Sequence, residues 1–135
     1  MRDSLRLIDV NFNRAKEGLR VCEDIMRFMY DDKALTQSFK KMRHDCSGIL
    51  LKFPVSYQKL VRARDSRYDV GKESVILEKK KLGWKDILIG NIKRSEEALR
   101  VLEEASKVIA LPESRRFQKL RFKLYELEKK TFKRL

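Results

Sequence analysis

The chain has 135 residues, of which 42% are hydrophobic and 39% charged, and its formal net charge is +13. This length fits a single domain (residues 1–135) that can bury one hydrophobic core. Only five Gly and two Pro are present, which argues against a turn-rich β fold. No run approaches the roughly 18 apolar residues of a membrane span, and the N-terminal residues lack the apolar segment of a signal peptide. Cys22 and Cys46 have no metal-ligand spacing, so we expect reduced thiols in a cytoplasmic protein.

The first half of the chain predicts two long helices. Apolar residues spaced by three and four mark one helix over about 5–30 and another over about 33–52. Asp32 is the expected N-cap of the second helix. Pro54 either ends this helix or opens a short one after it.

A different segment, about 63–83, separates the two halves. It has no helical periodicity and combines acids, arginines and a glycine, so we expect a functional loop. Beyond it, the apolar spacing predicts a third helix over about 85–110 and a fourth over about 112–135. Pro112 suits the first position of that last helix.

The two halves repeat one helical motif. Residues 11–24 align with residues 91–104 at an offset of 80, and residues 39–43 resemble residues 117–121 at an offset of 78. The matched pairs are Asn11/Asn91, Arg14/Arg94, Glu17/Glu97, Leu19/Leu99, Arg20/Arg100, Val21/Val101 and Glu23/Glu103. The sequence therefore predicts an all-α helical bundle of two pseudo-symmetric helical hairpins, covering about 5–52 and 85–135.

The matched polar residues have two interpretations. Arg14, Glu17, Arg94 and Glu97 could form inter-helix ion pairs that fix the register of the bundle, since buried charges need partners. Alternatively, the arginines bind phosphate, for which the guanidinium fork is well suited. Gly18 lies beside this polar set and indicates a close approach of two helices.

The chemistry of the remaining motifs points to anions. The glycines never cluster, so a phosphate would be held by Arg and Lys side chains or by helix N-termini. Asp65 and Asp69, beside Arg64, suit a Mg²⁺-nucleotide site, although capping or turn formation would also explain them.

His44 is interpreted as a structural helix residue rather than a general base. The net charge is compatible with solvated helix faces or an anionic partner. The basic last helix has few aromatic residues for stacking, which makes nucleic acid an unfavoured partner.

Several separated stretches resemble one family closely. They are residues 9–24 with Arg27 and Phe28, Arg43 with His44, and residues 63–71, 91–104 and 121–128. The family is the small helical hydroxymethylpyrimidine phosphate kinase domain of thiamine biosynthesis, which is often fused in front of thiamine-phosphate synthase. The resemblance spans nearly the whole chain. Lys72 departs from it, at a position where we expect a hydroxyl side chain.

This resemblance implies that the chain transfers the γ-phosphoryl group of ATP, with Mg²⁺, onto 4-amino-5-hydroxymethyl-2-methylpyrimidine phosphate. Such a transfer needs positioning and charge neutralisation, which arginines can supply. The candidate catalytic residues are Arg14, Arg94 and Asp65. The candidate substrate- or phosphate-binding residues are Asn11, Arg20, Arg43, Arg64, Gly71, Asn91, Arg100 and Arg121. The candidate Mg²⁺ ligands are Asp65 and Asp69.

Two other functions stay open at this stage. One is a non-catalytic accessory domain that binds thiamine-phosphate synthase or phosphorylated metabolites. The other is a basic nucleic-acid-binding bundle, whose affinity would fall steeply with salt. A homodimer through an apolar side of the bundle is also compatible with the sequence.

Overall fold

Five α-helices make up the described structure, a computed structural model that covers residues 2–72 and 82–135. They are α1 (Arg2–Phe28), α2 (Lys33–Leu51), α3 (Tyr57–Ala63), α4 (Trp84–Ile109) and α5 (Leu111–Arg134). The described residues contain no strand, so the all-α fold class is confirmed. Residues 73–81 of the predicted loop lie outside the described residues.

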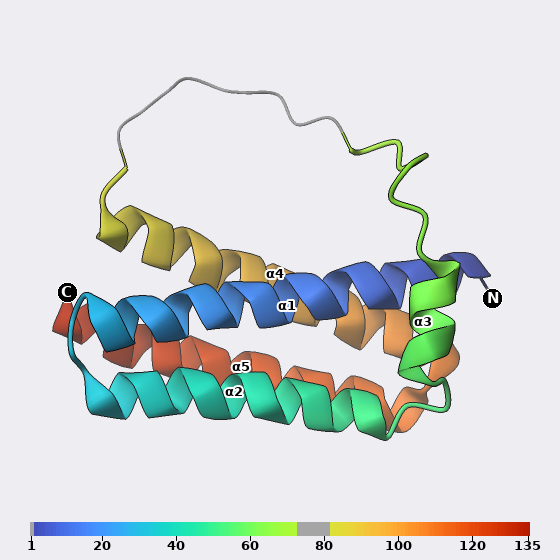
Figure 1. Ribbon diagram of the computed structural model, residues 1–135. Helices are drawn as coiled ribbons and strands as arrows, with labels where there is room; N and C mark the ends of the chain where they lie inside the picture. The colour runs from blue at the N-terminus through green and yellow to red at the C-terminus, as the bar shows by residue number, and fades with distance from the viewer. Residues whose placement is uncertain (1, 73–81) are drawn as a thin grey trace.

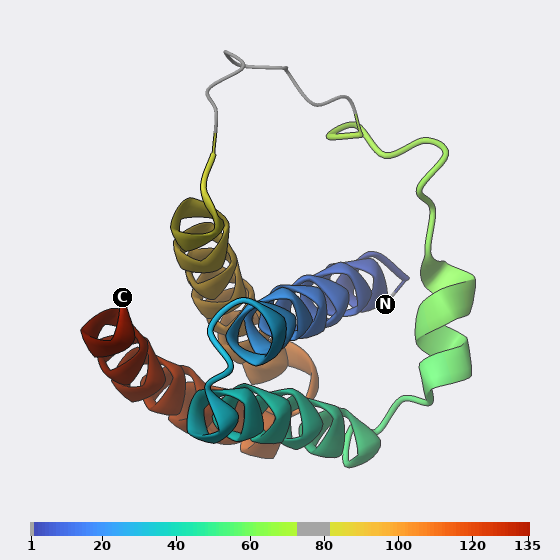
Figure 2. The same cartoon turned by 60° about the vertical axis from the view of Figure 1, so that its left-hand side comes forward.

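The four long helices form two antiparallel hairpins. Figure 1 shows α1, α2, α4 and α5 extending along one common direction, with the short α3 set across them near the N-terminus. The helix α1 packs against both α2 and α4, and α5 packs against α4 and α2. In Figure 2, α1 and α4 lie together above α2 and α5. The predicted arrangement of two hairpins in one bundle is confirmed.

The helix boundaries follow local capping chemistry. Asp31 has a positive φ of 51°, and Asp32 accepts a hydrogen bond from the Leu35 amide at 2.9 Å, which confirms the predicted N-cap of α2. Pro54 lies between α2 and a short helix, α3, whose N-cap is Ser56. The last two helices are separated only by Ala110.

The first helix begins earlier and ends earlier than its apolar stripe predicts. It runs from Arg2 to Phe28 rather than from about 5 to 30. The stripe reports only the buried face, whereas Arg2 and Asp3 extend the helix as exposed residues. The other long helices deviate from their predicted limits by about one residue.

The core lies where the four long helices meet. Its fully buried apolar side chains include Ile8, Leu19, Met26, Phe39, Leu88, Ile92, Leu99, Leu102, Phe117 and Leu124. Cys22 and Cys46 are also buried, and neither is in a disulfide. Burial raises the pKa of both thiols to about 12, so they are packing residues rather than nucleophiles. Among the described helices, none is long and apolar enough to cross a bilayer.

A close crossing joins α1 to α4, as the small residue predicted. Ser95 Oγ donates a hydrogen bond of 3.1 Å to the carbonyl oxygen of Ala15. A Cβ placed on Gly18 would overlap Ser95 Oγ and lie 2.9 Å from the carbonyl oxygen of Asn91. Gly18 is therefore the residue that allows the two backbones to approach each other.

Candidate functional site

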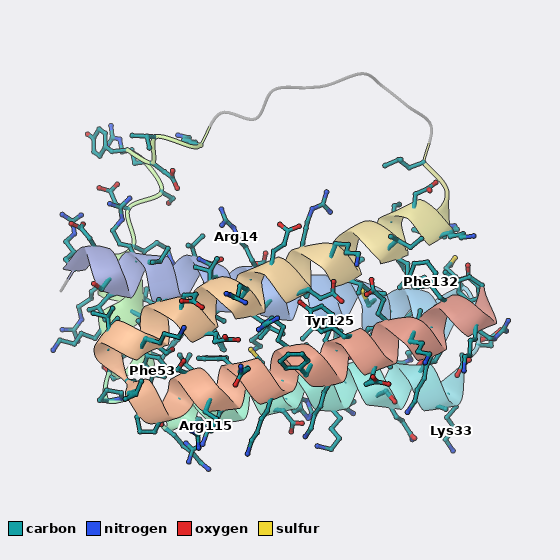
Figure 3. All side chains as sticks on the ribbon, turned by 180° about the vertical axis from the view of Figure 1, so that it is seen from behind. Arg14, Lys33, Phe53, Arg115, Tyr125 and Phe132 are labelled. Carbon is teal, nitrogen blue, oxygen red and sulfur yellow. The ribbon has the colours of Figure 1, made fainter. Side chains whose placement is uncertain are left out.

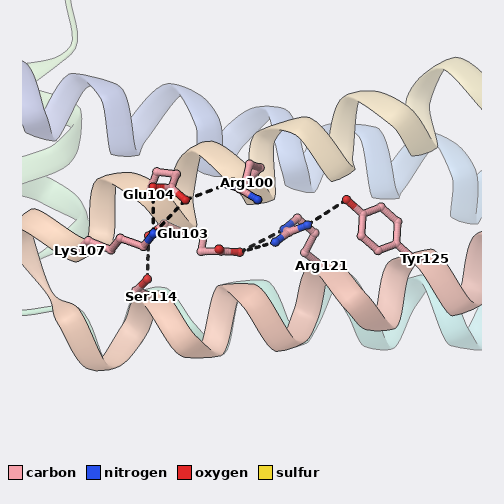
Figure 4. A network of polar contacts seen from close by, with 7 residues as sticks. All are labelled: Arg100, Glu103, Glu104, Lys107, Ser114, Arg121 and Tyr125. Atoms are coloured by element: carbon pink, nitrogen blue, oxygen red, sulfur yellow. Dashed lines mark hydrogen bonds and ion pairs between the residues drawn. The ribbon is translucent and has the colours of Figure 1, made fainter.

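Each hairpin contains a Glu–Arg ion pair between its two helices, at the same position of the repeat. Arg121 Nε and Nη2 donate to Glu103 Oε1 at 3.1 and 2.9 Å, and Arg121 Nη1 donates to the Tyr125 hydroxyl at 3.0 Å (Figure 4). In the first hairpin, Arg43 Nε donates to Glu23 Oε1 at 3.1 Å. Both guanidinium groups are therefore already held by carboxylates inside the protein.

These pairs correct the ion-pair interpretation of the repeat. The sequence suggested pairs among Arg14, Glu17, Arg94 and Glu97, but all four side chains are exposed. Within residues 2–72 and 82–135, none of the four forms an ion pair. Glu23 and Glu103 form the pairs instead, because their positions on α1 and α4 face the second helix of each hairpin.

Other predicted residues are also engaged locally. The Asn11 and Asn91 side-chain amides each donate to a carbonyl four residues earlier, at 3.0 and 2.8 Å, so both bind their own helix. Arg20 and Arg100 are exposed and pair with carboxylates on the same helix, Arg20 with Glu23 and Arg100 with Glu104. Arg20 and Arg100 leave most of their donors facing solvent, so they stay candidates for binding an anion.

Four predicted site residues gather in one groove at the N-terminal half of α1. We call it the ionic groove; it has a volume of about 600 Å³. It is lined by Asp3, Arg6, Leu7, Asp9, Val10, Asn13, Arg14, Glu17, Arg64, Asp65, Ser66 and Asp69. The predicted residues among these are Arg14, Arg64, Asp65 and Asp69. Figure 3 shows Arg14 pointing away from the helix bundle, which leaves its guanidinium accessible.

The segment 64–69 is fixed to α1 by a bidentate ion pair. Arg64 Nε lies 2.7 Å from Asp9 Oδ2, and Arg64 Nη2 lies 2.9 Å from Asp9 Oδ1. The Asn13 amide donates to the same Asp9 Oδ1 at 3.3 Å. The hydrogen bonds to Asp9, and then Tyr57, raise the pKa of Arg64 further above its usual value. Arg64 therefore acts as a permanently charged anchor, and its fork is occupied.

Asp9 is the residue of this groove that motif reasoning did not single out. It is almost fully buried, at 3% exposure, in the middle of an apolar stripe. A buried carboxylate requires a cationic partner. The position of Asp9 in the apolar stripe, close to Ile8 and Phe12, was therefore the sequence signal for a buried ion pair.

The two acids of the loop have turn contacts. Asp65 Oδ1 accepts a hydrogen bond from the Tyr68 amide at 3.1 Å, while Asp65 Oδ2 lies 3.3 Å from Arg2 Nη2. Asp69 Oδ1 accepts from the Gly71 amide at 2.8 Å. These bonds shape the loop as the turn interpretation expects, and they present both carboxylates at the groove. Across the described residues, no three His, Cys, Asp or Glu side chains group to hold a metal ion by themselves.

Two predicted site residues remain, and both lie outside the groove lining. Gly71 is exposed in the loop, where its amide donates to Asp69. Arg94 is exposed on α4 next to Ser95, at the crossing with α1, and is not part of the groove lining. The ionic groove is thus built from the first repeat and the loop, although the repeat suggested equivalent roles for Arg14 and Arg94.

Fold and site together define a small domain of two repeated helical hairpins with an ionic groove between its first helix and a loop. Residues 6–130 match the ThiD2 family, and the chain belongs to this family. The resemblance drawn from the sequence is thereby confirmed at the level of the helical domain.

Curated relatives are longer proteins named thiamine-phosphate synthase. The one from Synechocystis sp. is 35% identical over 124 residues, which cover 91% of this chain and 34% of that protein. The one from Nostoc punctiforme is 36% identical over 124 residues with the same coverage. The one from Rhodopirellula baltica is 32% identical over 125 residues, covering 92% of this chain and 33% of that protein. The chain thus spans about a third of these relatives, and no solved structure matches it.

Proposed function

We propose that this protein phosphorylates 4-amino-5-hydroxymethyl-2-methylpyrimidine phosphate to the diphosphate with ATP, as a step of thiamine biosynthesis. The ionic groove is the observation that carries the proposal, since it combines an exposed arginine with two loop carboxylates. Membership of the ThiD2 family, and similarity to proteins named thiamine-phosphate synthase, support a role in thiamine biosynthesis.

The reaction joins two polyanions, so the site must offset their repulsion. An oxygen of the substrate's phosphate attacks the γ-phosphorus of ATP, and ADP leaves with the electron pair of the broken P–O bond. Arg14 forms no ion pair within the described residues, so its donors are available to a phosphate oxygen. Removal of one such charge-stabilising group from a phosphoryl-transfer site lowers the rate strongly.

The loop carboxylates supply the second part of the site. Asp65 and Asp69 would hold Mg²⁺, which neutralises phosphate charge, and the metal would take its other ligands from nucleotide phosphates and water. Both acids are accessible at the groove, and this donor set of one or two carboxylates is the usual one for Mg²⁺-nucleotide sites. The Asp9–Arg64 pair holds the loop carboxylates near Arg14.

The remaining arginines divide by their contacts. We assign Arg43 and Arg121 to positioning the helices of each hairpin, because Glu23 and Glu103 occupy their guanidinium groups. Arg20, Arg94 and Arg100 remain candidates for binding phosphate from the exposed surface.

Phosphorus NMR on the purified chain with ATP, Mg²⁺ and the pyrimidine phosphate tests the proposal directly. We expect the pyrimidine diphosphate to appear only with Mg²⁺. Arg14→Ala should lower kcat/KM by about 100-fold or more, with unchanged helical circular dichroism. Arg27→Ala, at an exposed arginine of the same helix outside the ionic groove, is the matched control and should behave as wild type. Absence of diphosphate with the wild-type chain would overturn the proposal.

A second function is favoured by the length of the relatives. Because the chain matches only a third of proteins named thiamine-phosphate synthase, it could instead be a non-catalytic domain that works with a synthase. That function predicts binding of the pyrimidine phosphate, or of a separately purified synthase, without ATP turnover. Mg²⁺-dependent formation of ADP and pyrimidine diphosphate would exclude it.

A further inference from the structure

A second groove lies beside the ionic groove, and its lining is mainly apolar. We call it the apolar groove; it has a volume of about 770 Å³. It is lined by Phe12, Asn13, Lys16, Ser47, Leu50, Leu51, Phe53, Pro54, Val55, Ser56 and Tyr57. These residues come from α1, α2 and the segment that leads into α3. Size, apolar walls and a few polar groups are typical of a site for a small organic molecule.

One cation, Lys16, lies in this groove. Lys16 Nζ lies 5.2 Å from the centre of the Phe12 ring. Within residues 2–72 and 82–135, Lys16 forms no ion pair, although carboxylates pair with many other lysines and arginines of the bundle. An unpaired ammonium group beside aromatic and aliphatic walls suits a ligand that is apolar at one end and anionic at the other.

The internal repeat offers a built-in comparison for this groove. In the second hairpin, Glu96 replaces Lys16, Glu128 replaces Leu50 and Tyr125 replaces Ser47. There, Lys93 Nζ lies 3.4 Å from Glu96 Oε1 and 3.0 Å from Glu128 Oε2.

The two hairpins thus share one Glu–Arg ion pair at matching positions but differ at the groove positions. In the second hairpin a lysine lies between two glutamates, and Glu96 Oε2 has no hydrogen-bond partner among the described residues. The first presents Lys16, which has no ion pair among the described residues, at a groove with mainly apolar walls. The first half also carries α3 packed against α1, and the segment that leads into α3 forms one wall of the groove.

The apolar groove adjoins the ionic groove. Asn13 lines both, and its amide is bonded to Asp9, the residue that anchors Arg64. Tyr57, which lines the apolar groove, is one of the groups that raise the pKa of Arg64. A ligand in the apolar groove would thus have its polar end close to the arginine and carboxylates of the proposed kinase site.

We infer that the apolar groove binds the flat heteroaromatic ring of a phosphorylated pyrimidine, and that Lys16 contacts the ligand's phosphate. This inference rests on the proposed function and assigns its acceptor substrate to one groove, leaving the ionic groove for Mg²⁺-ATP. Tyr57 is 53% exposed and offers aromatic surface for the ring, while Phe12 and Phe53 line the groove as largely buried side chains. Asn13, Ser47 and Ser56 place polar atoms at the groove for hydrogen bonds to the nitrogen atoms of the ligand.

Isothermal titration of the whole chain with the pyrimidine phosphate, and separately with Mg²⁺-ATP, tests the assignment. Ser47→Leu places a larger side chain in the groove, and Ser38→Leu is its matched control. Both serines are half-buried on α2, and both donate to a carbonyl four residues earlier. Ser38 is not among the residues that line the groove. Equal melting temperatures of the two variants would show that folding is unaffected.

We expect Ser47→Leu to raise the Kd of the pyrimidine phosphate at least about tenfold, with Kd for Mg²⁺-ATP unchanged and Ser38→Leu as wild type. Lys16→Gln should raise the same Kd by about 10- to 100-fold, since it removes a charge-assisted contact. This second variant keeps the inference testable if Ser47→Leu does not fold.

The other outcomes separate this inference from the kinase proposal. Wild-type affinity in both Ser47→Leu and Lys16→Gln would overturn the inference, even if the diphosphate is formed. Weaker Mg²⁺-ATP binding with unchanged pyrimidine binding would also overturn it, and would assign the groove to the adenine ring. Pyrimidine binding that is sensitive to Ser47→Leu, without diphosphate formation, would support the groove and overturn the kinase. Failure of the wild-type chain to bind the pyrimidine phosphate would overturn both.

Discussion

Arg64 holds Asp9 through two hydrogen bonds of 2.7 and 2.9 Å, and this pair fixes the loop of the ionic groove to the first helix. Asp9 is 3% exposed, whereas the Arg64 side chain is 41% exposed, so the carboxylate depends on the pair more than the guanidinium does. The contact ties to the first helix the loop that carries Asp65 and Asp69, which line the same groove as Arg14.

Asp9→Asn should loosen this loop and lower the free energy of unfolding by about 1–3 kcal/mol, because a charge-assisted pair is lost next to the core. Urea denaturation measures the free energy, and amide hydrogen exchange of residues 64–69 reports the loop. Asp3→Asn, at a carboxylate of the same helix that is 94% exposed, is the control and should change neither quantity. Unchanged exchange in Asp9→Asn would show that the pair does not anchor the loop.

The Glu103–Arg121 pair should be structural and not part of phosphate binding. Glu103→Leu leaves the guanidinium of a residue that is only 7% exposed without its carboxylate, and should cost about 3–5 kcal/mol of unfolding free energy. The double variant Glu103→Leu with Arg121→Met should recover most of this loss. Glu104→Leu, at the exposed neighbouring position, is the control.

The same double variant also tests the alternative role of Arg121. If the diphosphate forms at the wild-type rate in phosphorus NMR, Arg121 makes no phosphate contact that matters for turnover. A loss of activity in a stably folded double variant would return Arg121 to the phosphate-binding residues and contradict our assignment.

The sequence predicted the elements far better than the partners of its charged residues. Apolar spacing and the Asp32 cap depend on neighbours in the chain, so α1, α2, α4 and α5 could be placed within a few residues. The repeat predicted the two hairpins, and Gly18 predicted a close approach of two helices, which the structure identifies as α1 and α4. All of these signals are local or come from matching one half of the chain to the other.

The ion pairs depend on how helices rotate against each other, which spacing does not encode. Glu23 and Glu103 were recognised as a matched pair, but their partners Arg43 and Arg121 follow from tertiary packing. Arg64 reaches Asp9 across 55 positions in the chain, so only the folded structure brings them together. For the same reason, the sequence predicted a loop with acids but could not predict which helix it faces.

Gly18 and Gly48 are both helical glycines, and they should respond oppositely to alanine. A Cβ at Gly18 would overlap Ser95 Oγ and press on a carbonyl of α4, so Gly18→Ala should cost about 1–3 kcal/mol despite better helix propensity. A Cβ at Gly48 meets nothing within 4 Å, so Gly48→Ala should stabilise by up to about 1 kcal/mol.

Chemical denaturation of the two alanine variants checks this contrast. Adding Ser95→Ala to Gly18→Ala should restore only part of the loss, because the carbonyl of Asn91 stays 2.9 Å from the new Cβ. Stabilisation by Gly18→Ala would show that the two helices are not held at the observed separation.

A buried carboxyl pair in the second hairpin should make stability depend on pH. Burial, and then the neighbouring Glu128, raise the pKa of Glu96 to about 7, while Lys93 opposes the shift. The folded chain therefore keeps a proton on Glu96 that the unfolded chain releases near its ordinary pKa of 4.5. The contribution of the Glu96 carboxyl to the free energy of unfolding is largest below about pH 4.5. It falls as the pH rises towards 7 and is constant at higher pH.

Glu96→Gln mimics the protonated carboxyl, so it should remove this dependence. Between about pH 5 and pH 8, the free energy of unfolding of the wild type should fall relative to that of Glu96→Gln by on the order of 2 kcal/mol. Urea denaturation at several pH values measures the difference. Glu97→Gln, at the exposed neighbouring position, should keep the wild-type slope. If the wild type and Glu96→Gln have parallel pH profiles, Glu96 is already ionised in the folded chain, and Lys93 outweighs its burial.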